Sequence, residues 1–315
     1  MMARRRRRKK RKYSKEQIIS IVLFLLIVFF IEVYNGNIKL DNLFDTVKNV
    51  NEKEKPASKT LDGLEVYYID VGQADSVLIR TTGENMLIDA GNNEDGNTLV
   101  NYFKSLDITK FNYVVGTHPH EDHIGGLDNI IKNFDIDTFF IPNVFTTTRT
   151  FEEVLDALDS KGLKFKVPEV DKEYTLGEAK FKVLYLGEDD KDLNDTSIVI
   201  KLTYGETSYL FTGDASTKVE KKLLNKDIKS DVLKLGHHGS KYSSSSDFLF
   251  KVNPKYAIAS CGDSNMYHHP HTSILKKLKE NNIKLYRTDK DGTIISYSDG
   301  VKIKFKTEKS DKDGK

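Results

Sequence analysis

His118-Pro-His-Glu-Asp-His123 places three imidazoles and two carboxylates within six positions. Neutral imidazole nitrogens and carboxylate oxygens are the ligands that proteins offer to zinc, iron and manganese. The apolar run at residues 111–116 is typical of a buried strand, and residues 124–131 have helical spacing. The sequence therefore predicts a metal-binding turn between a strand and a helix, where polar side chains project freely.

A surface tract of histidines, with Asp122 as a helix cap, is the simpler alternative for this stretch. Four potential ligands (His118, His120, Asp122 and His123) on one turn after a strand are hard to explain that way. Pro119 also stiffens the turn, which lowers the entropy lost when the ligands are held in place. The pattern favours a metal site.

The N-terminal 34 residues differ in character from the rest of the chain. Residues 1–15 hold ten Lys or Arg and no acid, and the sixteen residues 18–33 are almost all apolar. Such a helix would span about 24 Å, slightly less than the ~30 Å hydrocarbon core of a bilayer. We expect a basic cytoplasmic tail at 1–17 lying on anionic lipid, a single-pass anchor at 18–34, and an extracellular remainder. A cleaved signal peptide is the rival interpretation, although residues 32–37 offer no small-residue cleavage site.

Net charge limits the binding partners of residues 16–315, most of which are expected to lie outside the cell. The whole chain has 49 basic and 47 acidic residues, a net charge of +2. Without the ten basic residues of the tail, residues 16–315 have 39 basic and 47 acidic residues, or −8. A net acidic domain argues against a broad electrostatic grip on a polyanion, although a local basic patch remains open. Cys261 is the only cysteine, so an intramolecular disulfide is excluded.

The rest of the chain predicts an α/β (α+β) fold in four layers. Residues 35–60 are expected to form a polar linker. Two blocks follow it, the first from residue 65 and the second from about residue 180. In each block, predicted strands come first and are followed by alternating strands and helices. Two such blocks predict an αββα sandwich over residues 61–308, with two sheets face to face and helices outside. Residues 309–315 are expected to be a disordered tail.

Four other predicted strand ends carry Asp or His. They are Asp89, Asp214, the pair His237 and His238, and the segment His268-His-Pro-His271. Each could be a turn former by itself. Their convergence at one face of the sandwich is the simpler account, and it would complete a site with residues 118–123.

These motifs resemble a known family. His118-x-His120-x-Asp122-His123 is similar to the HxHxDH signature of the metallo-β-lactamase superfamily, and the segments 88–91, 212–214, 236–240 and 269–271 fit its other motifs. Over residues 62–307 the chain looks most like the hydrolase domains of ComEC-type competence proteins. The resemblance implies a metallo-β-lactamase-like fold and two divalent metal ions, zinc or else manganese.

The resemblance also implies roles for individual residues. The implied metal ligands are His118 and His120 for the first ion, Asp122, His123 and His237 for the second, and Asp214 between the two. Asp89 would hydrogen-bond to a ligand without binding metal. The implied substrate and catalytic residues are His238 and Ser240 around the phosphate, Asp122 orienting the nucleophile, and His269 or His271 protonating the leaving oxygen.

One segment departs from the superfamily pattern. Leu193-Asn-Asp-Thr-Ser197 has no His where another ligand of the first metal is usual. Asn194 or Asp195 could substitute, and the first site is expected to hold its metal loosely. An oxygen ligand in place of nitrogen also raises the chance of manganese.

These observations predict a membrane-anchored, metal-dependent hydrolase whose catalytic domain lies outside the cytoplasm. Its expected substrates are phosphoesters, most of all phosphodiesters, which include DNA. The expected nucleophile is a metal-bound hydroxide. The alternatives are a hydrolase of small or cell-wall phosphodiesters such as choline-phosphate esters, a β-lactam or thioester hydrolase, and a non-enzymatic metal-binding surface module. No protein partner is predicted.

Overall fold

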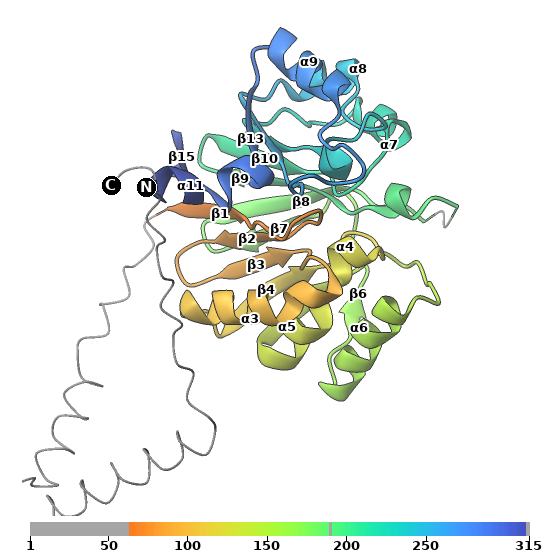
Figure 1. Ribbon diagram of the computed structural model, residues 1–315. Helices are drawn as coiled ribbons and strands as arrows, with labels where there is room; N and C mark the ends of the chain where they lie inside the picture. Colours follow the sequence, from red (N-terminus) through yellow and green to blue (C-terminus); the bar gives the residue numbers. More distant parts are fainter. Residues whose placement is uncertain (1–62, 189–190, 313–315) are drawn as a thin grey trace, which may run out of the picture. The chain divides into compact units, whose positions relative to one another are not determined.

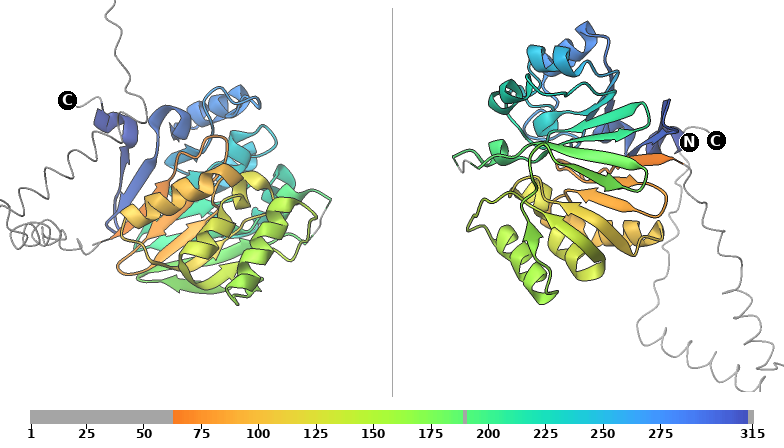
Figure 2. Two further views of the ribbon diagram at one scale, coloured as in Figure 1. Left: turned by 60° about the horizontal axis from the view of Figure 1, so that its bottom comes forward. Right: turned by 180° about the vertical axis from the view of Figure 1, so that it is seen from behind.

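The computed structural model describes residues 63–188 and 191–312. They form two mixed sheets, each covered on its outer face by helices (Figure 1; Figure 2 gives two further views). The predicted basic tail, anchor and linker lie outside the described residues. Within those two ranges, no helix has both the length and the apolar character needed to cross a bilayer.

The first sheet has eight strands in the order β15-β14-β1-β2-β3-β4-β5-β6. They are β1 (Leu64–Tyr68), β2 (Val77–Arg80), β3 (Asn85–Ile88), β4 (Lys110–Val115), β5 (Asp135–Phe140), β6 (Phe165–Lys166), β14 (Ile294–Ser298) and β15 (Ile303–Thr307). The helices between them are η1 (Asn93–Asp95), α3 (Gly96–Ser105), α4 (Glu121–Ile124), α5 (Leu127–Asn133) and α6 (Arg149–Ser160). Strands β3 to β6 run parallel, and α3, α5 and α6 cover the outer face.

The second sheet has seven strands in the order β13-β12-β11-β10-β9-β8-β7. They are β7 (Glu173–Leu176), β8 (Ala179–Tyr185), β9 (Val199–Tyr204), β10 (Thr207–Phe211), β11 (Val232–Lys234), β12 (Tyr256–Ala259) and β13 (Lys284–Arg287). The helices of this half are η2 (Leu193–Thr196), α7 (Thr217–Leu223), η3 (Gly236–Gly239), α8 (Ser246–Val252) and α9 (Thr272–Glu280). Helix α10 (Thr288–Asp291) connects β13 to β14 of the first sheet, and α11 (Glu308–Lys312) follows β15. Strands β10 to β13 run parallel, and α7, α8 and α9 cover the outer face.

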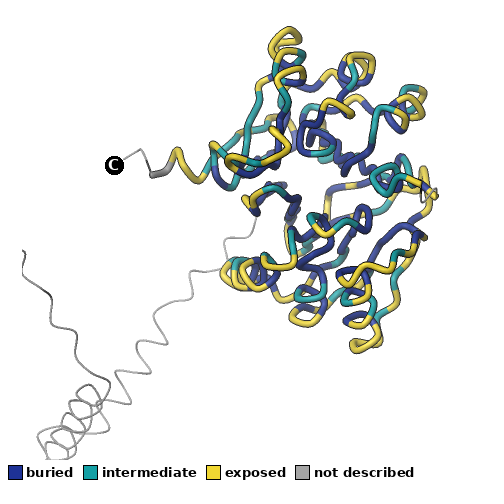
Figure 3. The backbone as a smooth tube through the Cα atoms, turned by 45° about the vertical axis from the view of Figure 1, so that its right-hand side comes forward, coloured by how far each residue is buried: buried dark blue, intermediate teal, exposed yellow. Residues whose placement is uncertain are grey.

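The four layers follow from strands that are apolar on both faces. In β1, Val66 and Tyr68 point into the core between the sheets, whereas Tyr67 packs on the helix side. In β10, Phe211 joins the inter-sheet core and Leu210 joins the core beneath the helices of the second half. Since successive side chains of a strand alternate between faces, such runs must be buried on both sides. Figure 3 shows the buried strands inside and the exposed turns and helix faces outside.

The αββα prediction holds for the described residues, with differences in detail. The last two strands, β14 and β15, were expected in the second half but extend the first sheet, where β14 pairs antiparallel with β1. Strand β7 was not predicted, because its short run EYTL has a charged start and little apolar pattern. Helix α11 runs to Lys312, into the segment expected to be disordered.

Polar residues that follow strand ends in both sheets meet at one edge of the sandwich. In the first sheet, β3 and β4 are parallel neighbours and are followed by Asp89 and by the 118–123 turn. In the second sheet, β10 and β11 are parallel neighbours and are followed by Asp214 and by η3. Parallel neighbours bring their carboxyl ends together, so the fold explains why residues far apart in the sequence form one site.

Candidate metal centre

Asp89 fixes the strand-to-helix turn that carries the histidines. Its backbone is in the left-handed region, with φ 59°, an uncommon conformation for a residue other than glycine and one that recurs at functional sites. The backbone N–H of Thr117 donates to Asp89 Oδ1 at 2.8 Å, and the Thr117 hydroxyl donates to Oδ2 at 2.7 Å. His123 Nδ1 lies 2.7 Å from the same Oδ2. Asp89 therefore holds the turn and orients the His123 ring.

That contact determines which nitrogen His123 offers to the site. With Nδ1–H donating to Asp89, Nε2 carries the lone pair and lies 3.3 Å from Asp214 Oδ1. Both atoms are buried and have no hydrogen-bond partner among the described residues. Two buried acceptors that face each other need a proton or a cation between them.

Asp214 lies between the histidines of the two halves. It follows β10 through Gly213, and its backbone N–H donates to Ser197 Oγ at 3.0 Å. Its Oδ1 faces His123, while its Oδ2 lies 3.7 Å from His237 Nε2 and 3.6 Å from His238 Nε2. One carboxylate thus presents an oxygen to each side of the centre.

His238 forms the buried floor of the site. His237 and His238 are both left-handed, with φ 50° and 55°, and the following Gly239 has φ 88°. A Cβ on Gly239 would lie 2.6 Å from the Pro270 side chain, so only glycine fits this tight turn. His238 Nδ1 lies 3.0 Å from the carbonyl of Ser260, and its Nε2 lies 3.1 Å from Asp122 Oδ2.

Four residues therefore form one group suited to a metal ion: Asp122, His123, Asp214 and His238, whose ligand atoms lie within 4.8 Å of one another. A second group, Asp75, Asp89 and His123, shares His123 and is fully buried. Its carboxylates are already engaged by Thr117, His123 and Lys234. The first group fits an ion, and the second fits the hydrogen-bonded shell behind it.

The pKa shifts reflect the opposite charges that this group brings together. Burial alone would raise the pKa of Asp214, but His123 and His238 hold it well below its usual range. Burial would lower the pKa of His238, yet the Asp214 and Asp75 carboxylates raise it to about 10. For Asp122, burial is again opposed, chiefly by His123, and its pKa falls to about 2. Protons on the histidines balance the carboxylates here, and a divalent cation can replace them.

The other half of the centre is less complete. His118 is buried, and its Nε2 lies 3.0 Å from Nδ1 of His120. Desolvation lowers the pKa of His118 well below its usual value, so its ring is neutral and able to bind a cation. Neither His118 nor His120 belongs to either group of three or more His, Cys, Asp or Glu ligands found among the described residues.

Asn194 is the neighbouring side chain placed to complete this half. It lines the same cavity as His120, and its buried Oδ1 has no hydrogen-bond partner in the described part of the chain. Asp195 is engaged elsewhere, because its Oδ1 accepts from the backbone N–H of Ser216 and its Oδ2 lies 4.0 Å from Lys218 Nζ. Of the two residues that the sequence left open, geometry favours Asn194.

A cavity of about 310 Å³ opens over the centre. Its lining residues are Gln73, His120, Glu121, Asp122, Asn194, Asp214, His237, His238, Tyr267 and His269. The His269 ring centroid lies 5.5 Å from that of His237, and its Nδ1 lies 3.3 Å from Gln73 Nε2. Tyr267 is 58% exposed and stacks on His269 at the rim.

Three residues with implied substrate or catalytic roles lie elsewhere than expected. His238 is buried in the four-residue group, while His237 is more exposed and lines the cavity, so the two histidines exchange their expected places. Ser240 is buried and does not line the cavity. His271 does not line it either, because it precedes α9 and its Nδ1 accepts from the backbone N–H of Lys241. The sequence could not order adjacent histidines on a left-handed turn.

Asp75, Lys234 and Gln73 were not predicted from the sequence. Asp75 and Gln73 lie in the loop after β1, so the rule that singled out Asp89 and Asp214, a polar residue after an apolar strand, applied to them as well. Lys234 interrupts the apolar strand run Val232-Leu-Lys-Leu235. A lysine in such a strand indicates a buried ion pair.

The different positions of His237 and His238 predict different effects of mutation. His238→Ala is expected to weaken zinc binding by about 100-fold or more, because it removes a buried member of the four-residue group. His237→Ala is expected to weaken it by about 10-fold or less. Competition with a chromophoric chelator measures both. Equal losses in the two variants would contradict this geometry.

The αββα sandwich, with a His/Asp centre at the edge where both sheets end, defines a metal-dependent hydrolase of the metallo-β-lactamase type. Residues 69–263 match the Metallo-beta-lactamase superfamily, and the chain belongs to that superfamily.

Its relatives include competence proteins. The chain is 31% identical over 251 residues to ComE operon protein 3 of Bacillus subtilis, a match that covers 73% of this chain and 32% of that protein. It is 32% identical over 231 residues to competence protein ComA of Neisseria gonorrhoeae, covering 71% of this chain and 31% of the relative. The chain thus matches about a third of the length of these curated relatives.

Solved structures share the fold at low sequence identity. The metallo-beta-lactamase fold protein YhfI from Bacillus subtilis has a TM-score of 0.51 at 13% identity, covering 72% of this chain and 96% of YhfI. Igni18, a metallo hydrolase from Ignicoccus hospitalis, has a TM-score of 0.51 at 16% identity, covering 73% of this chain and 98% of Igni18.

Proposed function

We propose that this protein hydrolyses phosphodiesters with the help of two divalent cations held at the centre. The observation that carries the proposal is the group of Asp122 and the buried residues His123, Asp214 and His238 beneath an open polar cavity. His118, His120 and Asn194 would hold the other ion, the first of the two that the sequence predicts, more loosely. When bound, such ions neutralise phosphoryl charge and make water acidic enough to attack near neutral pH.

The residues around the cavity have separate tasks in this proposal. The Asp122 carboxylate is 34% exposed, and it faces the cavity as well as His238, so it can accept a hydrogen bond from the attacking water and orient it. His237 and His269 line the cavity, and burial lowers the pKa of both rings, that of His269 to about 4. Neutral imidazoles can each donate one N–H to a phosphoryl or leaving oxygen.

Gln73 and Tyr267 can position the substrate. The Gln73 side chain accepts from the backbone N–H of Gly262 and contacts His269, so it bridges the loop after β1 and the loop after β12 and fixes the His269 ring. Tyr267 presents a largely exposed aromatic face beside the cavity. A flat group next to the scissile phosphate could stack on that face.

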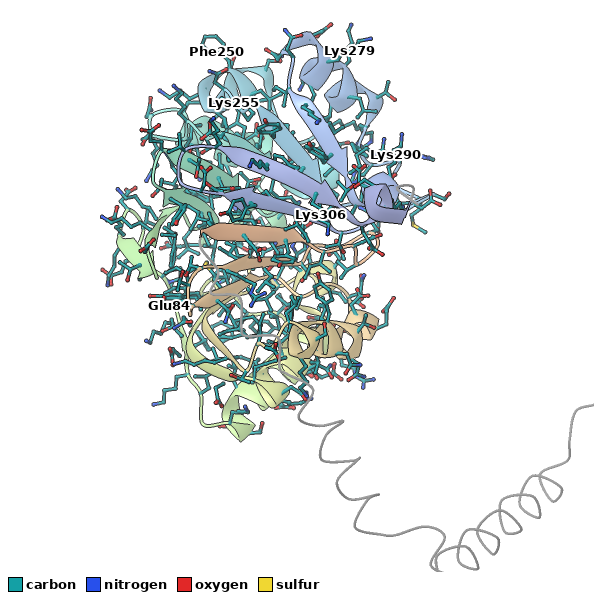
Figure 4. All side chains as sticks on the ribbon, turned by 90° about the vertical axis from the view of Figure 1, so that its left-hand side faces the viewer. Glu84, Phe250, Lys255, Lys279, Lys290 and Lys306 are labelled. Atoms are coloured by element: carbon teal, nitrogen blue, oxygen red, sulfur yellow. The ribbon has the colours of Figure 1, made fainter. Side chains whose placement is uncertain are left out.

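DNA is the first substrate that we propose, since relatives of this chain have names that refer to competence and, for one from Haemophilus influenzae, to recombination. Small or cell-wall phosphodiesters are the second. The net charge of −8 for residues 16–315 favours them. So does the lining of the cavity, which includes no lysine or arginine. Exposed lysines such as Lys279 and Lys290, at the periphery in Figure 4, do not line it.

We also propose that residues 18–34 anchor the protein in the cell membrane and that the hydrolase acts outside the cell. The charge asymmetry between the basic tail and the remainder supports this orientation. Protease protection of the domain in intact cells, compared with permeabilised cells, tests it. Degradation only after permeabilisation would contradict an extracellular position.

A substrate panel tests the proposed activity. The full-length protein, loaded with zinc or with manganese, is expected to hydrolyse bis(4-nitrophenyl) phosphate and either DNA or a choline-phosphate ester, but not the β-lactam nitrocefin. Repeating the assay at 50 and 200 mM salt separates the substrates, because binding of a polyanion through several phosphates weakens by orders of magnitude over that range. Turnover of nitrocefin alone, or of nothing in the panel, would overturn the proposal.

A further inference from the structure

A lysine is fully buried directly behind the metal centre. Lys234 is the last residue of β11, and 1% of it is exposed. Its Nζ lies 2.8 Å from Asp75 Oδ2 and donates to the carbonyl of Leu235 at 3.0 Å. A charged ammonium is rarely buried to this extent unless it is paired.

The partner carboxylate belongs to the other sheet. Asp75 is 3% exposed and lies in the loop between β1 and β2. Its backbone N–H donates to the carbonyl of Asp122 at 3.0 Å, and its own carbonyl accepts from Gly91 N–H at 2.8 Å. The ion pair therefore joins β11 of the second sheet to the loop that supports the 118–123 turn of the first.

The second oxygen of Asp75 reaches the floor of the site. Asp75 Oδ1 lies 3.3 Å from His238 Nδ1 and has no conventional hydrogen-bond partner within the described residues. His238 Nδ1–H thus faces two acceptors, this oxygen and the Ser260 carbonyl. With the proton held on Nδ1, the Nε2 lone pair points to Asp122 and Asp214.

We infer that the buried pair Asp75–Lys234 is a positioning device for His238 as a metal ligand. Asp75 fixes the ring and makes Nε2 more basic, while Lys234 holds Asp75 in place and balances its charge next to the carboxylates of the centre. The inference rests on the proposed metal site and adds two residues to it, neither of which touches the cavity.

A purely structural role explains the pair less well. Replacing a buried ion pair by neutral groups of similar volume is often neutral or stabilising, because both charges lose their hydration on burial. The fold by itself therefore has little need of the pair. A carboxylate behind a ligating imidazole, in contrast, strengthens the ligand, and its loss typically weakens metal binding by about 10–100-fold.

The test is zinc affinity of the full-length protein, measured with zinc alone by competition with a chromophoric chelator. In Asp75→Asn and in Asp75→Asn/Lys234→Met, the zinc dissociation constant is expected to rise about 10–100-fold. Without metal, the double variant is expected to unfold at a midpoint close to that of the wild type. Arg287→Met is the control, since it breaks the Arg287–Asp289 pair, which is largely buried but includes no residue of the four-residue group or of the cavity lining, and it is expected to leave zinc affinity unchanged.

The outcomes separate this inference from the proposed function. Wild-type zinc affinity (within threefold) in a folded double variant would overturn the positioning role and leave the metal site intact. A wild-type protein that binds neither zinc nor manganese would overturn both. If the double variant does not fold, Asp75→Asn alone decides, because asparagine keeps the size and an acceptor for Lys234 while removing the charge.

Discussion

Replacing Asp214 with asparagine is expected to lower phosphodiester turnover by about 10³-fold or more, with the fold retained. Asp214 is 2% exposed, and its two oxygens face His123 on one side and His237 and His238 on the other. Asparagine has the same shape, but it offers one neutral oxygen where the centre uses two charged ones. Initial rates on bis(4-nitrophenyl) phosphate with saturating zinc or manganese measure the effect.

The matched control for Asp214→Asn is Asp137→Asn. Asp137 is half exposed and pairs with Lys110 at the surface at 2.7 Å, a type of contact worth roughly 0–1 kcal/mol. Its loss is expected to leave turnover unchanged. An Asp214→Asn protein with more than a tenth of wild-type activity would show that the centre is not where hydrolysis occurs.

Phe181→Ala is expected to destabilise the protein by about 3–5 kcal/mol. Phe181 on β8 is 1% exposed and packs edge-to-face on Tyr113 of β4, with ring centroids 4.9 Å apart, so it ties the second sheet to the first. Its removal leaves a cavity that neighbouring strands of two sheets cannot collapse to fill. Urea unfolding of the metal-free protein measures the change in the free energy of unfolding.

Phe250→Ala provides the comparison for that measurement. Phe250 is 83% exposed on α8 and stands out from the surface in Figure 4, so its truncation is expected to change stability by less than about 0.5 kcal/mol. Similar losses in both variants would contradict the assignment of the inter-sheet core.

Local pattern predicted most of the secondary structure of the described residues. Strands and helices of regular apolar spacing, such as β4 and α6, were found close to their observed bounds. The pairing of strands was harder to predict. The apolar pattern shows that residues 294–298 form a strand, but it does not show which strand lies beside them. This strand, β14, pairs with β1, whose edge of the first sheet would otherwise remain open.

The same contrast holds for the site. The histidine cluster, Asp89 and Asp214 were visible as polar residues after strands, and the structure brings them together. The order of His237 and His238 depends on two left-handed residues, which no spacing reveals. Asp75 and Lys234 each carried a local signal, a polar residue after a strand and a lysine within an apolar strand, but that they pair across the two sheets could not be read from either segment.

Removal and return of metal tests the central claim most directly. The full-length protein, stripped with a chelator and dialysed, is expected to lose phosphodiester turnover and to recover it when zinc or manganese is added, with up to two ions bound per chain. The Asp214→Asn variant treated in the same way is expected to recover no activity. Full turnover by the stripped wild-type protein, with metal analysis showing less than a tenth of an ion per chain, would contradict the account.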